Sequence, residues 1–252
     1  MQQNRFELKY LIDEGRARSI RDFLRGRLVH DEHALKRPDY RYPVYSLYLD
    51  SPELTCYREV LCGKKNRFKL RVRFYDDGQC GPLFFEIKRR LNDVILKKRT
   101  AVRPQALHRL LSGQWPSYDD LIDPDSGTDY EVLQHFTGLA KTLRAEPKVC
   151  VAYSREAYTS PENETLRITF DRNVACSRHC SIEFPDVADI RDEAHPGVIL
   201  ELKFTDTFPA WLNDMVGCFN LKRRSFAKYV NSVEHLLQGG ARLHGAAREA
   251  LV

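Results

Sequence analysis

The 252-residue sequence lacks any segment typical of secretion or membrane insertion. Its first ten residues, MQQNRFELKY, contain no apolar stretch of about 7–15 residues followed by a small-residue cleavage site. No run of about 18 apolar residues occurs anywhere, which excludes a membrane-spanning helix. We therefore expect a cytoplasmic protein with no membrane segment.

The sequence also lacks the short motifs of the common nucleotide-binding and catalytic classes. It contains no G-x-x-x-x-G-K-[ST] loop, no G-x-G-x-x-G after a strand and no kinase H-R-D signature. Neither G-x-S-x-G nor H-E-x-x-H occurs. The eight histidines are scattered singly, so we interpret each as a surface residue rather than a catalytic base.

The cysteines do not form a disulfide framework. There are seven, an odd number, in a sequence without a secretion signal, which favours reduced thiols. The nearest approach to a metal cluster is Cys176-Ser-Arg-His179-Cys180. A structural zinc site needs four ligands, usually as two separated pairs, and no second pair exists here. We therefore interpret this segment as a plain loop.

An excess of one charge sign is also missing. The 40 Lys and Arg nearly cancel the 35 Asp and Glu, leaving a formal net charge of +5. A protein that coats polyanions non-specifically would show a larger imbalance, because phosphate neutralisation needs many unpaired cations. With 42% hydrophobic residues the chain can still bury a sizeable core.

Alternation and capping signals predict an α+β protein with antiparallel strands, since regular βαβ alternation is missing. Asp13 can cap a helix, and Ser51-Pro52-Glu53 can begin another that Gly63 ends. Asp77-Gly78 predicts a turn between two strands. Strands are expected at 5–10, 43–50, 67–75, 83–89, 94–102, 149–158, 165–171 and 198–204. Further helices are expected at 104–112, 129–143, 209–219 and 225–237.

Five of these strands carry charged residues on one side and apolar residues on the other, because successive side chains of a strand point to opposite faces. An antiparallel sheet with one wet face gives the same alternation. Here, however, the polar positions are nearly all Arg, Lys and Glu. The sets are Arg5, Glu7 and Lys9; Lys69, Arg71 and Arg73; Glu86 and Lys88; Arg167, Thr169 and Asp171; and Glu201 and Lys203.

These residue types suit a phosphate-rich ligand. Arg favours planar, bidentate recognition of phosphate, and a repeated Glu is suited to a divalent cation that bridges to an anion. If the sheet curls until the charged faces converge, the result is a basic channel with a few carboxylates. Such a channel could hold a triphosphate or polyphosphate chain.

The order of short motifs resembles the VTC domain, the polyphosphate polymerase domain of the triphosphate tunnel metalloenzyme superfamily. The resemblance covers about residues 4–237. It rests on Arg5-x-Glu7-x-Lys9-Tyr10, Ser46-Leu-Tyr48-Leu-Asp50, Lys69-Leu-Arg71-Val-Arg73, Glu86-Ile-Lys88, Tyr153-Ser-Arg155, Arg167-x-Thr-x-Asp171, Glu201-Leu-Lys203 and Ser225-Phe-Ala-Lys228-Tyr229.

The resemblance implies a fold and a set of site residues. The implied fold is an antiparallel β-barrel forming a tunnel with capping helices, here a single domain over residues 1–240 with a tail at 241–252. Glu201 would hold Mn²⁺ or Mg²⁺, with Glu7 and Glu86 as helpers. The implied phosphate ligands are Lys9, Arg71, Arg73, Lys88, Arg155, Arg167, Lys203 and Lys228. Of these, Arg71, Arg73 and Arg155 would act in catalysis together with Glu201.

The roles of some residues remain open, and the first motif of the sequence departs from that of related hydrolases. Either Lys98 or Arg99 can take a further basic position, and Tyr48 and Tyr153 either bond within the tunnel or pack as core residues. Related hydrolases of the CYTH type open with E-x-E-x-K, whereas this sequence has Arg5 at the first position, which favours the polymerase branch. The eukaryotic polymerase also carries a phosphate-sensor domain and transmembrane helices, for which this chain has no room.

The implied activity is transfer of the γ-phosphoryl group of ATP to phosphate or a polyphosphate chain. Two alternatives stay open: a metal-dependent triphosphatase of the same fold, and a non-catalytic polyphosphate-binding module. Nucleic-acid binding is disfavoured, because aromatic residues are not interleaved with the charged positions as base stacking requires.

Overall fold

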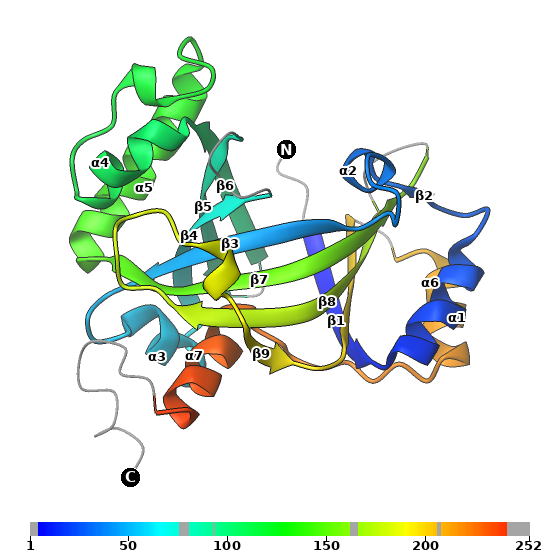
Figure 1. Ribbon diagram of the computed structural model, residues 1–252. Coiled ribbons are helices and arrows are strands. Elements are labelled where there is room, and N and C mark those ends of the chain that lie inside the picture. The colour runs from blue at the N-terminus through cyan, green and yellow to red at the C-terminus, as the bar shows by residue number, and fades with distance from the viewer. Residues whose placement is uncertain (1–4, 76–80, 93, 162–165, 206–207, 241–252) are drawn as a thin grey trace. The chain divides into compact units, whose positions relative to one another are not determined.

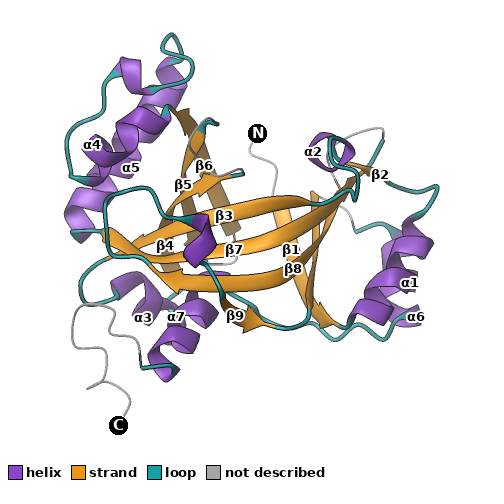
Figure 2. Ribbon diagram, viewed as in Figure 1, coloured by secondary structure: helices purple, strands orange, loops and turns teal. Residues whose placement is uncertain are grey.

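The computed structural model describes residues 5–75, 81–92, 94–161, 166–205 and 208–240. Its ten strands form an antiparallel sheet accompanied by helices, which confirms the predicted α+β class (Figure 2). The strand order is β1-β10-β8-β7-β3-β4-β5-β6, with β2 paired to β7 and β9 to β8. Within the described residues this order starts at β1 and ends at β6, so the sheet is open in its pairing.

The chain divides into two compact units that share four strands. The first unit comprises residues 1–43, 153–174 and 195–227; the second comprises 44–152, 175–194 and 228–252. The shared strands β3, β7, β8 and β9 each contribute residues to both units. No helix within the described ranges is long and apolar enough to cross a membrane.

The first unit is built on the antiparallel strands β1, β10 and β8. Its elements are β1 (Arg5–Ile12), α1 (Glu14–Leu24), β2 (Val29–His30), α2 (Glu32–Leu35), α6 (Ala210–Cys218) and β10 (Val198–Thr205), with parts of β7 (Glu146–Thr159) and β8 (Leu166–Arg178). The predicted cap of α1 is confirmed, since Asp13 Oδ1 accepts the Arg16 N–H at 2.7 Å.

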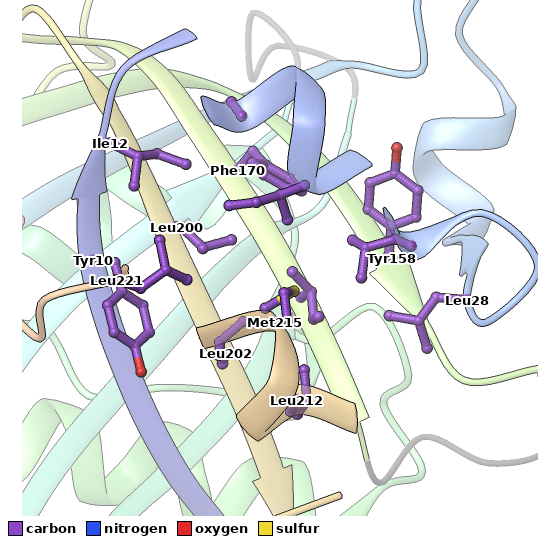
Figure 3. Packing of buried hydrophobic residues seen from close by; sticks show 14 of the residues in the cluster. Tyr10, Ile12, Leu28, Tyr158, Phe170, Leu200, Leu202, Leu212, Met215 and Leu221 are labelled. Atoms are coloured by element: carbon purple, nitrogen blue, oxygen red, sulfur yellow. The ribbon is translucent and has the colours of Figure 1, made fainter. Parts of the chain in front are cut away.

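The core of the first unit lies between its sheet and two helices. Tyr10 of β1, Leu200 of β10 and Phe170 of β8 point to one face, where α1 and α6 pack (Figure 3). Leu212 and Met215 of α6 are fully buried against it. The apolar positions of the alternating strands are thus covered by helices, which leaves the charged positions on the opposite face.

The second unit holds the other strands and most of the helices. Its elements are β3 (Tyr42–Asp50), α3 (Thr55–Leu61), β4 (Asn66–Phe74), β5 (Leu83–Leu91), β6 (Val94–Val102), η1 (Pro104–Ala106), α4 (Leu107–Leu111), η2 (Tyr118–Asp120), α5 (Gly127–Leu143), η3 (Val187–Asp189), β9 (Asp192–His195) and α7 (Lys228–Gln238).

The apolar face of β3, β4 and β5 packs against α4 and α5. Leu70 and Phe85 of the strands and Phe136 of α5 are almost completely buried in this core. The rings of Phe85 and Phe136 meet edge to face, 4.9 Å apart. Helices α3 and α7 lie side by side elsewhere in the same unit (Figure 1).

Several predicted boundaries shift in the structure. Helix α3 begins at Thr55 rather than at Pro52, because Leu54 adopts a left-handed backbone conformation with φ 57° just before it. Strand β8 continues to Arg178, so Cys176 lies in a strand and is buried rather than in a loop. The short β2, β9 and α2 were not predicted. The expected Asp77-Gly78 turn and the 241–252 tail lie outside the described residues.

Candidate functional site

Strands β4, β5 and β6 of the second unit present a face dominated by cations, here called the basic face. The register pairs Lys88 of β5 with Lys69 on one side and Lys97 on the other, and it pairs Glu86 of β5 with Arg71 and Arg99 in the same way. Positions two residues apart on each strand share this face. On these three strands the basic face carries one carboxylate, Glu86, and eight cations: Arg67, Lys69, Arg71, Arg73, Lys88, Arg90, Lys97 and Arg99.

Glu86 lies at the centre of the basic face and is completely buried. Arg71 contacts its Oε2 at 2.5 Å, while Lys97 Nζ and Arg99 Nε lie 2.7 and 3.7 Å from Oε1. Burial opposes the charge of this carboxylate, but Arg71 and Arg73 outweigh it and hold the Glu86 pKa far below its usual range. Glu86 therefore holds neighbouring cations in place.

Two arginines of β4 are oriented by hydroxyl groups of β3. Arg71 Nη1 donates to Tyr48 Oη at 3.2 Å, and both Nε and Nη2 of Arg73 donate to Ser46 Oγ at 3.4 Å. Burial would raise the pKa of Tyr48, but Arg71 and Arg73 overcome it and lower the pKa to about 8. The tyrosine therefore lies in a strongly positive environment.

A second charged surface belongs to the first unit and is here called the mixed face. It consists of β1, β8 and β10. In the register, Glu201 of β10 pairs with Lys9 and Thr169, and Lys203 of β10 pairs with Glu7 and Arg167. The described charged side chains of these strands that share this face are balanced: Lys9, Arg167 and Lys203 against Glu7, Asp171 and Glu201.

Glu201 is the centre of the mixed face, with an almost buried side chain. Its Oε1 lies 3.2 Å from Lys9 Nζ, and its Oε2 lies 2.6 Å from Lys203 Nζ and 3.8 Å from Arg155 Nη2. Lys9 also contacts Glu7 Oε1 at 3.0 Å and donates to the Phe226 carbonyl at 3.1 Å. One ammonium group thus joins two carboxylates from neighbouring strands.

The pKa values of the two lysines beside Glu201, Lys9 and Lys203, are shifted in opposite directions. Burial lowers the pKa of both. For Lys9, the carboxylates of Glu201 and Glu7 reverse this effect and raise the pKa above its ordinary value. For Lys203, burial prevails over Glu201, with Arg155 adding repulsion, and the pKa falls to about 8. Of these two lysines, Lys203 is therefore the one whose positive charge a bound anion would stabilise more.

Arg155 of β7 is fixed by a two-point contact with Asp171 of β8. Its Nε donates to Oδ1 at 2.7 Å and its Nη2 to Oδ2 at 2.8 Å. The guanidinium lies 5.2 Å from the ring centre of Tyr153 on the same strand. Such a bidentate pair restricts the orientation of the guanidinium plane.

Arg167 is held by a residue that sequence reasoning missed. Its Nη2 contacts Asp31 Oδ2 and Tyr42 Oη, and the Tyr42 hydroxyl donates to the same carboxylate oxygen at 3.0 Å. Asp31 caps α2 and lies far from Arg167 in the chain. No alternation pattern of the β8 strand could have indicated this partner.

A family profile described as the VTC domain matches residues 4–237. The chain belongs to the VTC domain family. Membership supports a phosphotransferase or triphosphatase related to triphosphate or polyphosphate.

Two solved structures are similar to this VTC domain at low sequence identity. The PH1819 protein from Pyrococcus horikoshii OT3 has 12% identity and a TM-score of 0.45 over 94% of this chain and 99% of that chain. The putative adenylyl cyclase HpAC1 from Hippeastrum, described as having a dominant triphosphatase activity, has 13% identity and a TM-score of 0.49 over 95% and 97%. No protein with a curated description matches.

The donors of the mixed face suit the divalent cation that the VTC resemblance implies. Glu7 and Glu201 supply carboxylate oxygens, the ligands that Mg²⁺ and Mn²⁺ prefer, and they already share one cationic group, Lys9. Within the described ranges no group of three or more His, Cys, Asp or Glu is placed to hold a metal. Mg²⁺ often takes only one or two protein carboxylates together with phosphate oxygens, so this pair fits such a site.

The predicted site residues divide between the two units of the VTC domain. Glu7, Lys9, Arg155, Arg167, Glu201 and Lys203 belong to the first unit, and Arg71, Arg73, Glu86, Lys88 and Lys228 to the second. Arg99 shares the basic face, whereas Lys98 pairs with Ile87 on the opposite face of the sheet, which favours Arg99 for the further basic position. Lys97 was missed, although the alternation of strand β6 places it with Arg99.

Lys228 is the first residue of helix α7, which begins here rather than at the predicted residue 225, and it is nearly buried. The first residue of a helix lies at the positive end of the helix dipole. The Lys228 ammonium group and the dipole would therefore both attract an anion at this position.

Proposed function

We propose that this VTC domain binds the triphosphate of ATP through the basic face and transfers the γ-phosphoryl group to phosphate or to the end of a polyphosphate chain. The remaining phosphate ligands of the proposal are Lys9, Arg155, Arg167, Lys203 and Lys228. Mn²⁺ or Mg²⁺ takes part in the reaction.

The observation that carries this proposal is the concentration of cations on the basic face. Eight cations share β4, β5 and β6 with one carboxylate, and that carboxylate is already engaged by Arg71, Lys97 and Arg99. An extended polyanion carries charge along its length and can interact with many of these cations at once, whereas a single small anion can contact only a few of them. Arginine also matches phosphate geometry with two parallel hydrogen bonds.

Glu7 and Glu201 are the proposed holders of the divalent cation, which when bound would neutralise charge on phosphoryl oxygens. Glu86 was also predicted as a helper. Its burial and its three cationic contacts favour a different role, that of holding Arg71 in place.

The chain's own residues supply position and charge rather than a covalent nucleophile. An oxygen of the acceptor phosphate attacks the γ-phosphorus in line while the bond to the β,γ-bridging oxygen breaks, so ADP leaves and the acceptor gains one phosphate. Arg71, Arg73 and Arg155 neutralise the oxygens of the transferred group. Phosphoryl transfer depends mainly on such positioning and electrostatic stabilisation.

Sizing the products of a reaction with ATP and Mn²⁺ tests the proposal. We expect chains longer than three phosphates, formed in step with ADP. Release of free phosphate alone would instead identify a triphosphatase. Tight binding of polyphosphate without turnover, unchanged in Glu201→Gln, would identify a binding module.

A further inference from the structure

A buried carboxylate at the end of β3 connects three elements of the second unit. Asp50 is completely buried and accepts the backbone N–H groups of Ser51, Cys56 and Tyr57 at 2.7, 2.8 and 3.0 Å. The hydroxyl of Tyr229, on helix α7, donates to its Oδ2 at 2.6 Å. Asp50 thus fixes the start of α3 and one tyrosine of α7 to the end of β3.

Tyr229 continues this connection towards the basic face. Its ring stacks on that of Tyr48, with the centroids 5.0 Å apart and an interplanar angle of 25°. The Tyr48 hydroxyl in turn accepts from Arg71 at 3.2 Å, and the Arg71 guanidinium lies 5.9 Å from the Tyr48 ring centre. Lys69 lies 5.7 Å from the ring centre of Tyr229.

This geometry goes beyond simple core packing. Tyr229 is 1% exposed, and its ring supports both Tyr48 and a cation of β4. The stacking on Tyr229 restricts the plane of the Tyr48 ring and therefore the position of the hydroxyl that accepts from Arg71. A guanidinium with a fixed acceptor loses less conformational freedom when it binds a phosphate.

We propose that Tyr229, anchored by Asp50, is a positioning residue for triphosphate binding, and that it acts through Tyr48 on Arg71. This inference rests on the proposed function, because it assumes that Arg71 contacts a phosphate. It assigns to Tyr229 a role separate from that of its neighbour Lys228, which is proposed to contact the ligand itself.

Calorimetric titration of the full chain with inorganic triphosphate tests the inference. Tyr229→Leu removes the ring and should weaken binding about ten-fold, whereas Tyr229→Phe removes only the donor to Asp50 and should weaken it about three-fold. Tyr130→Phe is the matched control. It removes a tyrosine hydroxyl that bonds the Pro116 carbonyl in the same unit, and it should leave the affinity unchanged.

A double-mutant cycle separates positioning from a general loss of structure. In an Arg71→Ala background, Tyr229→Leu should change the affinity by no more than about two-fold, because the residue through which it acts is gone. If Tyr229→Leu does not fold, Tyr229→Phe takes its place in the same cycle. Wild-type affinity in a folded Tyr229 variant, or an equal loss in both backgrounds, would overturn the inference. A wild-type chain that binds no triphosphate would instead refute the proposed function.

Discussion

At the scale of single residues, Glu201 has the most specific environment of the mixed face. Three cations approach its two oxygens, and one of them, Lys9, is shared with Glu7. This arrangement gives Glu201 two proposed tasks: it holds cations of the mixed face, and it supplies an oxygen ligand for a divalent metal.

Glu201→Gln should separate metal-dependent turnover from anion binding. The amide keeps the shape of the side chain but loses the charge that a divalent cation needs, so we expect turnover with Mn²⁺ to fall about 100-fold or more. Affinity for inorganic triphosphate, measured without metal, should stay the same or increase. Glu32→Gln, at an exposed position of α2, is the control. Undiminished turnover in Glu201→Gln would remove this residue from the proposed metal site.

The lowered pKa of Tyr48 predicts a pH-dependent contribution to stability. Between about pH 8 and pH 10 the folded protein has lost the Tyr48 proton while the unfolded chain still holds it. The free energy of unfolding therefore gains up to about 3 kcal/mol as the pH rises through this window, and this gain is lost as the pH falls through 8.

Denaturant unfolding of wild type and Tyr48→Phe at several pH values measures this contribution. The difference in stability between the two proteins should grow from pH 8 to pH 10. Tyr130→Phe retains Tyr48 and should follow the wild-type profile. A constant difference across the window would show that Arg71 and Arg73 do not favour the tyrosinate.

At the scale of elements, strand β4 shows how an alternating sequence builds a core and a binding face at once. Leu70 is completely buried against α4 and α5, while Arg71, the next residue, lies on the basic face. The two side chains lie one position apart but on opposite sides of the sheet.

A substitution at Leu70 should therefore lower stability, whereas a substitution at Arg71 should lower the affinity for triphosphate. Leu70→Asp buries an unpaired charge and should lower the free energy of unfolding by more than about 4 kcal/mol. Arg71→Ala should leave a folded protein, since Glu86 keeps Lys97 and Arg99, but should weaken triphosphate binding about ten-fold or more. Circular dichroism and calorimetry of both variants distinguish these effects. An unfolded Arg71→Ala, or one with normal affinity, would contradict the assignment of this face.

The same alternation explains how much of the structure could be predicted. Period-2 patterns indicated β4, β5 and the charged face of β10, because each strand carries its own core pattern. The start of α3 could not be predicted, since it depends on the left-handed backbone of Leu54 and on the carboxylate of Asp50. The contact of Asp31 with Arg167 could not be predicted either, because the two residues lie 136 positions apart in the sequence.

At the scale of the whole molecule, the small net charge conceals an uneven distribution. The chain carries a formal +5, yet β4, β5 and β6 place eight cations beside one carboxylate. On the mixed face, the charged side chains that the structure describes on β1, β8 and β10 are three cations and three carboxylates. The sequence could indicate that charged residues share strand faces, but only the register shows which faces have an excess of cations.

This distribution gives the most direct test of the account: the affinity for inorganic triphosphate of two variants with the same net charge. Arg71→Ala/Lys88→Ala removes two cations from the basic face, while Arg18→Ala/Arg25→Ala removes two exposed cations on or beside α1. We predict that the first variant loses affinity about 100-fold or more and that the second binds within about two-fold of wild type. Equal affinities in the two variants would contradict a phosphate-binding role for the basic face.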